Sequence, residues 1–202
     1  MRYRTLTTSA GVLVAALVLA GCSTTIANDR SDDANPQTAT SAPADTTEAN
    51  AADEMFAMMM IPHHEQAIEM SDAVLSKDGI DEAVRDLAQQ IKDAQGPEIA
   101  LMSGWLEDWG VDDHMMSGDT NHSGHMSGMM SDDSLDALDA ASGDEAAQIF
   151  LEQMIVHHQG AIDMAEYEVD NGHDPDVVDL AQRIIDGQTA EIATMHELLG
   201  TD

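Results

Sequence analysis

The sequence has one cysteine among its 202 residues, and aromatic residues are rare. Because Cys22 has no partner in the chain, the protein forms no internal disulfide, and the residues after it offer no thiolate to a metal. Only 3% of the residues are aromatic, whereas 15 are methionine. A hydrophobic core would therefore depend on aliphatic and thioether side chains.

Positive charge is also scarce. The chain has 7 Lys and Arg residues against 39 Asp and Glu residues, which gives a formal net charge of −32. So large a negative charge excludes nucleic acid and anionic lipid surfaces as electrostatic partners. Cations are the natural partners, although a solvated acidic surface would account for most of the carboxylates by itself.

Long hydrophobic runs are absent except near the N-terminus. There the basic segment MRYR precedes the apolar run LTTSAGVLVAALVLA, which is too short for a stable membrane span. Residues 1–21 are therefore predicted to be an export signal. The sequence LAGC at residues 19–22 resembles the lipobox of bacterial lipoproteins, which implies that Cys22 is lipidated and holds the exported protein to the cell membrane on its extracytoplasmic side. The alternative is an uncleaved anchor with a free thiol.

The segment after the signal has a composition typical of a linker. Residues 22–49 are rich in Ser, Thr, Ala, Asp, Asn and Pro and contain almost no large apolar side chain. Such a segment cannot bury enough surface to offset the entropy lost on folding. We expect a disordered tether here, followed by one folded domain over residues 50–202.

The predicted domain contains two copies of one pattern. FAMMMIPHHEQAIEM at residues 56–70 aligns with FLEQMIVHHQGAIDM at residues 150–164, including both HisHis pairs. Further on, VRDLAQQIKDAQGPEIALM at residues 84–102 aligns with VVDLAQRIIDGQTAEIATM at residues 177–195. This is an internal repeat, and its two copies cover about residues 53–109 and 144–200.

Each copy is predicted to form two helices. Apolar residues recur at helical spacing in both copies, and no segment alternates with period two. Asp81 and Asp174 are predicted N-caps, Pro175 suits a first helical position, and Ser142 with Glu145 forms a capping-box pattern. The fold class is therefore all-α, an antiparallel four-helix bundle of two hairpins. Residues 110–141 are expected to be a long Met- and His-rich loop that joins the hairpins.

Histidine and methionine fall on common helix faces. Residues four or seven positions apart lie on one side of a helix. The residues that share faces in this way are Met59, His63 and Met70, then Met60 with His64, and in the second copy Met154 with His158 and His157 with Met164. Met102 and Met195 occupy equivalent positions on the partner helices.

Imidazole with thioether, and without cysteine, favours copper over other metals. Thioether suits Cu(I), imidazole accepts both oxidation states, and Cu(II) binds most tightly among the divalent ions. For single methionines, packing in a core that has few aromatics is the simpler interpretation. Two HisHis pairs in register with methionine favour a metal site, because imidazoles are costly to bury without partners.

The predicted loop adds candidate ligands. Its segment DDHMMSGDTNHSGHMSGMMSDD lies among Ser, Gly, Asp and Asn, where core packing does not account for methionine. Weaker and more exchangeable copper sites are expected at His114, Met115, Met116, His122, His125, Met126, Met129 and Met130. A surface linker of biased composition is the alternative.

The two motifs, F…MIxHHxxAIxM and LAxxIxxxQxxEIxxM, resemble the exported bacterial His- and Met-rich CopM-like family, catalogued as a domain of unknown function, number three hundred and five. The resemblance covers about residues 53–199. It implies a ferritin-like four-helix bundle, copper binding outside the cytoplasm and a role in copper resistance. The positions that match the family pattern are Met60, His63, His64, Met70, Met102, Met154, His157, His158, Met164 and Met195. His196 has Ser103 as its counterpart, so the two halves need not bind equally.

Other function classes lack their motifs. His64-Glu65 begins an HExxH string, but Ile68 stands where the second histidine should be. The residues three positions before the four paired histidines are Met or Ile, so the Glu-x-x-His motif of di-iron bundles is absent as well. We therefore expect a copper-binding protein and no enzyme, with a copper-transfer protein as a further partner. The alternatives are a structural or adaptor lipoprotein and a bundle that binds haem or another metal.

Overall fold

The computed structural model describes residues 49–111 and 127–201. All four predicted helices are present, and the described residues contain no strand. The four long helices are α1 (Ala51–Leu75), α2 (Glu82–Trp109), α4 (Gly143–Asn171) and α5 (Pro175–Leu199). In the described part of the chain, no helix combines the length and apolar character needed to cross a membrane. The export signal, the tether, Cys22 and the candidate ligands at 114–126 lie outside the described residues.

Short-range polar contacts set most of the helix starts. Asp81 caps α2 by accepting the Ala83 backbone N–H, and Asp174 caps α5 in the same way, as predicted. Asn50 forms a reciprocal capping box with Asp53 at the start of α1. The capping box predicted at Ser142 is wrong, because its side chain makes no capping hydrogen bond. The next residue, Gly143, has a φ of +56°, which takes the first turn of α4 out of the geometry that a capping box needs.

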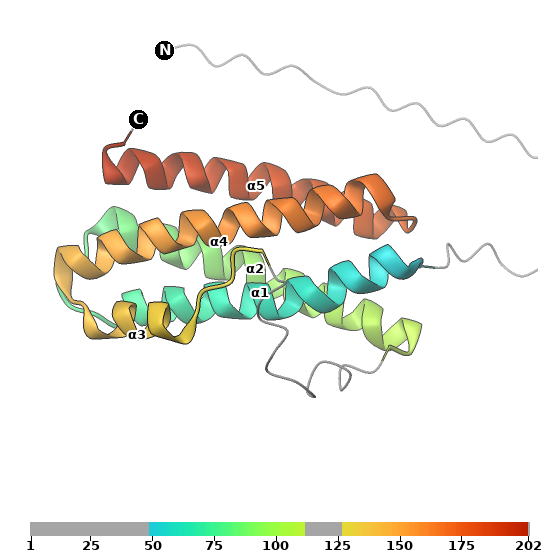
Figure 1. The fold of residues 1–202 in the computed structure, drawn as a ribbon, viewed down its shortest axis with the longest axis horizontal. Coiled ribbons are helices and arrows are strands. Elements are labelled where there is room, and N and C mark those ends of the chain that lie inside the picture. Colours follow the sequence, from blue (N-terminus) through green and yellow to red (C-terminus); the bar gives the residue numbers. More distant parts are fainter. Residues whose placement is uncertain (1–48, 112–126, 202) are drawn as a thin grey trace, which may run out of the picture. The chain divides into compact units, whose positions relative to one another are not determined.

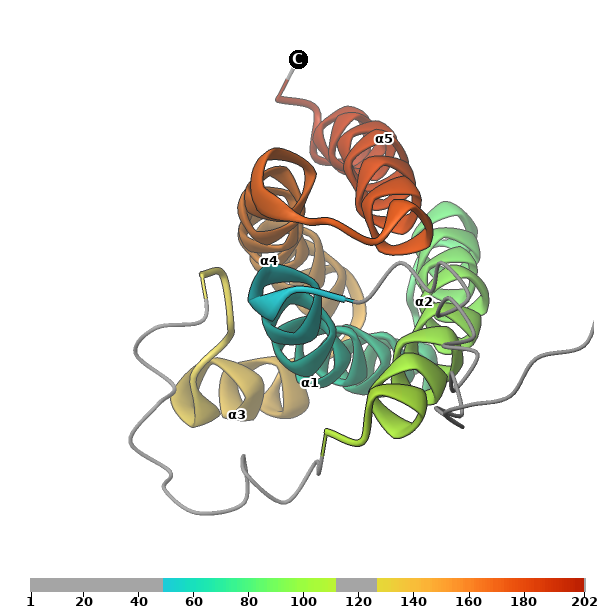
Figure 2. The ribbon, with the colours of Figure 1, turned by 90° about the vertical axis from the view of Figure 1, so that its right-hand side faces the viewer.

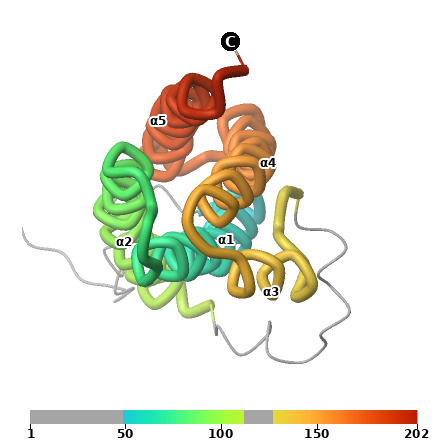
Figure 3. The backbone as a smooth tube through the Cα atoms, turned by 90° about the vertical axis from the view of Figure 1, so that its left-hand side faces the viewer, coloured from blue at the N-terminus to red at the C-terminus, as the bar shows by residue number. Residues whose placement is uncertain are grey.

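The helices pair as two hairpins. α1 packs mainly on α2 and α4 mainly on α5, and the hairpins join through α1 and α4, whereas α2 and α5 barely touch (Figures 1 and 2). The turns within the hairpins are short, so the helices of each hairpin run antiparallel. Viewed from the opposite end, the four long helices surround one interior (Figure 3). The predicted four-helix bundle is therefore confirmed.

The connection between the hairpins is not wholly a loop. Residues within it form a fifth helix, α3 (Asp132–Ala140), whose start is capped by Ser131. α3 contacts both α1 and α4, and its Leu138 is buried. The prediction of a loop over 110–141 missed this helix because its sequence, DDSLDALDA, is short and offers few apolar residues to mark a buried face.

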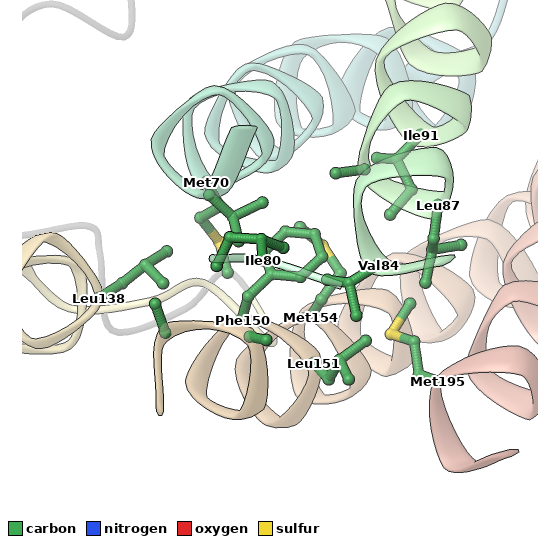
Figure 4. Packing of buried hydrophobic residues seen from close by; sticks show 14 of the residues in the cluster. Met70, Ile80, Val84, Leu87, Ile91, Leu138, Phe150, Leu151, Met154 and Met195 are labelled. Atoms are coloured by element: carbon green, nitrogen blue, oxygen red, sulfur yellow. The ribbon is translucent and has the colours of Figure 1, made fainter. Parts of the chain in front are cut away.

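The interior contains two separate hydrophobic clusters. The first takes its residues mainly from the C-terminal halves of α1 and α5, the N-terminal halves of α2 and α4, and α3. Met70, Met154 and Met195 lie in it with Phe150 and Leu138 (Figure 4). The second takes its residues from the opposite halves of the same helices and the first half of α5, and it includes Met60 and Met102. The middle of each long helix, between the clusters, therefore carries other residues.

Candidate metal centre

A band of buried polar side chains separates the two clusters, and we call it the polar layer. Each long helix contributes two of its members, at the point along the helix where the residues of one cluster end and those of the other begin. The polar layer comprises His63 and His64 on α1, Gln95 and Glu98 on α2, His157 and His158 on α4, and Gln188 and Glu191 on α5, and all of them are buried except Glu98, whose side chain is 24% exposed. All four histidines are completely buried. Buried polar side chains are expensive unless something binds them, so this band is the part of the interior that needs a chemical explanation.

The second histidine of each pair is hydrogen-bonded to an acid on the partner helix of its own hairpin. His64 Nε2 lies 2.8 Å from Glu98 Oε2, and His158 Nε2 lies 2.7 Å from Glu191 Oε2. A carboxylate can only accept, so in both pairs the imidazole Nε2–H donates. The carboxylates therefore fix the orientation of these two rings and leave each Nδ1 facing the interior without a partner.

The first histidines of the two pairs meet across the contact between α1 and α4. The ring centroids of His63 and His157 are 3.8 Å apart, with the ring planes tilted by 39°. His63 Nε2 donates to the Ser127 carbonyl oxygen at 3.1 Å. His63 Nδ1 and both ring nitrogens of His157 have no hydrogen-bond partner. We call His63 and His157 the imidazole pair.

Burial keeps the imidazole pair uncharged. It lowers the pKa of His63 to about 3, with a smaller contribution from neighbouring His64 and an opposing one from the bond to Ser127. Burial likewise lowers the pKa of His157 well below its ordinary value, with further lowering by the nearby His63, His158 and His64 and a small opposing contribution from the approach of the His63 backbone. At neutral pH His63 is therefore neutral, and since its Nε2 carries the proton, its Nδ1 presents a free lone pair.

Unpartnered polar atoms accumulate in the polar layer. Those with no hydrogen-bond partner are Nδ1 of His63, His64 and His158, both ring nitrogens of His157, both amide atoms of Gln95 and Oε1 of Gln188. Folded proteins leave few such atoms buried, so a concentration of them in one band suits the binding of an ion or of ordered water. A cavity of about 40 Å³ between α2 and α5 borders Gln95, Glu98, Gln188 and Glu191, which is room enough for either. Within the described residues, no three His, Asp or Glu side chains already form a chelating group. An ion would therefore need thioether donors or small rotations of the imidazoles.

The residues just before α3 cover the imidazole pair from outside. Residues 127–130, which we call the strap, run along the contact between α1 and α4 (Figure 2). The Ser127 carbonyl accepts from His63, and the Ser127 hydroxyl donates to Asp163 at 3.1 Å. Gln66 holds the other end by accepting the Met130 N–H at 2.7 Å and donating to the Met130 carbonyl at 3.0 Å. The strap thus closes the side of the polar layer that lies between α1 and α4.

Two glycines permit this close approach. Gly128 has a φ of +80°, and a Cβ there would lie 2.7 Å from the Val156 carbonyl oxygen. A Cβ on Gly160 of α4 would overlap the Ser127 carbonyl and come within 2.6 Å of the Gly128 nitrogen. The strap and α4 therefore touch backbone to backbone, which only glycine allows.

The predicted methionine ligands divide by burial. Met60, Met70, Met102, Met154 and Met195 are completely buried in the two hydrophobic clusters. Met59 and Met164 are partly exposed and line a surface cleft. In the strap, Met129 is partly buried, and Met130 packs against the first cluster, so the prediction that core packing does not account for the methionines of this segment is wrong for Met130.

His196 lies apart from the paired histidines. It is in the last turn of α5, where its Nδ1 is 3.0 Å from the Thr201 hydroxyl oxygen. Its ring borders a cleft together with Asp81 and Asp144, at the start of α2 and α4. The structure therefore gives His196 a local partner at the end of a helix and no link to the polar layer.

Sequence analysis missed Glu98 and Glu191, the acids that hold His64 and His158. A signal was present, because both belong to the repeated QxxEIxxM pattern and occupy the same position in the two copies. An acid in the same place on both partner helices, opposite a repeated HisHis, predicts a carboxylate–imidazole contact. The polar layer is therefore built twice, once by each hairpin.

Residues 53–199 match the model of the family described as Domain of unknown function (DUF305). A DUF305 protein from Streptomyces coelicolor, thought to be secreted, is 35% identical over 74% of this chain and 92% of its own, with a TM-score of 0.67. A DUF305 fragment from Deinococcus radiodurans is 31% identical over 75% of this chain and 97% of its own, also with a TM-score of 0.67.

A further similar structure is that of CopM in a Cu(II)-bound form. It is 34% identical over 72% of this chain and 94% of its own, with a TM-score of 0.62. CopM structures with Cu(I) bound and with silver bound are similar as well. Among curated proteins, none matches the chain significantly.

Proposed function

Since the chain belongs to the DUF305 family and resembles CopM, which has been solved with copper bound, we propose that it binds copper in the polar layer. The observation that carries this proposal is the set of buried, uncharged imidazole nitrogens with no hydrogen-bond partner. Such nitrogens need no deprotonation before they bind a metal, and imidazole suits both Cu(I) and Cu(II). A purely structural polar layer would be expected to pair these nitrogens with protein groups.

The imidazole pair is the proposed centre of the site. His63 and His157 come from different hairpins and lie in direct contact, so an ion held between them would join the two halves of the bundle. Met60 and Met154 precede these histidines by one helical turn and are the thioethers best placed to assist. Glu98 and Glu191 would then act as positioning residues for His64 and His158.

The rival interpretation is a structural lipoprotein whose histidines are satisfied by acids. His64 and His158 do have such partners, and taken alone they would fit that interpretation. His157 does not, because both of its nitrogens are buried and unpartnered. The imidazole pair therefore separates the two functions and is the place to test them.

The decisive experiment is a competition titration of the mature protein with Cu(I) and with Cu(II). We expect the double variant His63→Ala, His157→Ala to lose the tightest copper class while circular dichroism still shows a helical bundle. The matched control is His173→Ala, in an exposed position of the α4–α5 turn where only the backbone N–H makes a contact. Unchanged tight binding in the double variant would contradict a copper site in the polar layer.

The proposed setting is the outer side of the cell membrane, with Cys22 lipidated and copper sequestered there or passed to a partner. We propose no catalytic activity. Cys22→Ala should release the exported protein from the membrane fraction, because the acyl chains on Cys22 are the proposed attachment. Mass spectrometry that finds an unmodified Cys22 in a soluble mature form would contradict the anchoring.

A further inference from the structure

A second group of methionines lies at the surface, away from the polar layer. A cleft of about 320 Å³ opens between the N-terminal half of α1 and the C-terminal half of α4. Three thioethers border it, from Met55 and Met59 on α1 and from Met164 on α4. The other residues that line it are Phe56, Ser127, Asp163 and Tyr167. We call this the methionine cleft.

Core packing explains these three side chains only in part. Five other methionines of the long helices are completely buried, as expected of core residues. Met55, in contrast, is 38% exposed, Met59 is only partly covered, and Met164 is partly covered by its packing against the second cluster. Exposed thioethers are open to oxidation and contribute little hydrophobic burial. Their grouping around one opening therefore needs another reason.

The internal repeat supplies a comparison within the same molecule. By the alignment of the two copies, Met55 and Met59 correspond to Ile149 and Gln153, and Met164 corresponds to Met70. At that equivalent place α3 packs on α1 and α4. Met70 belongs to the first hydrophobic cluster and Ile149 packs against it. Gln153 donates to the Ser134 carbonyl oxygen of α3 at 2.8 Å. One of the two equivalent grooves is thus filled by a helix. Among the described residues, no helix fills the other groove, which is bordered by two more thioethers.

The polar groups of the methionine cleft suit a cation. Asp163 provides a carboxylate at its edge, and the Ser127 hydroxyl donates to that carboxylate. Phe56 and Tyr167 add aromatic rings, which attract cations to their faces. Thioethers prefer soft, monovalent metal ions and bind them without losing a proton. The lining therefore favours metal ions that are soft as well as positively charged.

We propose that the methionine cleft is a second metal site, specific for a soft monovalent ion, that loads from solvent independently of the imidazole pair. Met55, Met59 and Met164 are its ligands, and Asp163 provides counter-charge. Ser127 connects the two places, because its hydroxyl faces the cleft through Asp163 while its carbonyl accepts from His63. An ion in the cleft therefore lies at the outer face of the strap that covers the imidazole pair.

The test uses Ag(I), a soft monovalent ion with no accessible second oxidation state under these conditions. The mature protein is labelled with ¹³C at the methionine methyl groups and titrated while each methyl signal is followed by NMR. We expect the signals of Met55, Met59 and Met164 to move together at one stoichiometric step. Met55→Leu, at a partly exposed position, should weaken Ag(I) binding in that step at least about tenfold. Removing a residue that only supports a metal ligand already lowers metal affinity by about tenfold or more, so removing a ligand should cost no less. Met58→Leu is the matched control, because Met58 packs against the second cluster and does not line the cleft.

The same titration on His63→Ala, His157→Ala separates this proposal from copper binding in the polar layer. We expect the three cleft signals to move as in the wild type even where the tight copper class is lost. If the triple variant Met55→Leu, Met59→Leu, Met164→Leu binds as many Ag(I) ions as the wild type, the methionine cleft is not a metal site. If the cleft signals stop moving in the histidine variant, the cleft does not load independently, and the proposal is overturned.

Discussion

Replacing Gly160 by alanine tests whether the strap is held as the structure shows. The new Cβ would overlap the Ser127 carbonyl and approach the Gly128 nitrogen, both of which are backbone atoms that cannot move aside alone. Either the strap or α4 must shift. The strap is the weaker partner, because it is fixed by a few hydrogen bonds while α4 packs along α1 and α5.

The expected loss of stability follows from the hydrogen bonds that hold the strap. Displacing the strap breaks the exposed bond from Ser127 to Asp163, which contributes little, and three partly buried bonds, one from His63 to Ser127 and two between Gln66 and Met130. At roughly 1 kcal/mol each, the partly buried bonds contribute about 3 kcal/mol. Alanine is better than glycine inside a helix by about 1 kcal/mol. The free energy of unfolding should therefore fall by about 2 kcal/mol, the difference between these two effects.

The assay is urea unfolding of the chelated protein, combined with hydrogen exchange of the Met130 amide, which donates to Gln66 in the wild type. Gly187→Ala on α5 is the matched control, since nothing lies within 4 Å of its new Cβ. We expect that variant to be more stable than the wild type by about 1 kcal/mol. A Gly160→Ala protein as stable as the control, with the Met130 amide still protected, would refute this account of the strap.

Three further changes test the buried ionisable groups. Burial, with contributions from Asp53 and Asp174, raises the pKa of Glu168 to about 8, so the free energy of unfolding should fall as pH rises from about 4.5 through 8. In Glu168→Gln, the urea midpoints at pH 6 and pH 9 should differ less than in the wild type. The pKa of His63 is about 3 in the folded protein and ordinarily 6.5, so the chelated protein should lose stability as the pH falls from about 6.5 towards 3. Urea unfolding curves over this pH range should show a smaller loss for His63→Gln. Glu191→Gln should weaken copper binding in competition titrations by about tenfold, because the carboxylate orients a ligand rather than binding the ion; an unchanged affinity would remove it from the site.

The helices of this protein could be predicted from sequence because their signals are local. The N-caps at Asp81 and Asp174 and the helical spacing of apolar residues lie within a few positions of each other. The repeat also made the hairpin pairing predictable, since two similar hairpins most simply pack on each other. These features depend on one segment at a time.

The polar layer could be predicted only in part. The HisHis pairs were evident, but the contact of His63 with His157 depends on how α1 and α4 are rotated against each other. Packing of whole helix faces decides that rotation, and no short motif encodes it. The strap was missed for a related reason, because Gly128 and Gly160 are distant in sequence and their meaning appears only when the two backbones touch.

The duplicated polar layer also has a consequence for how the binding site is assembled. One hairpin alone carries one HisHis pair and would leave its first histidine on an open face, because the ring that covers it belongs to the other hairpin. Such a half would complete its site only by dimerising, and its affinity for metal would then depend on protein concentration. Joining both halves in one chain makes that second encounter intramolecular, so it no longer depends on protein concentration. A single molecule can therefore present the complete proposed site even when copies of it are too sparse to meet.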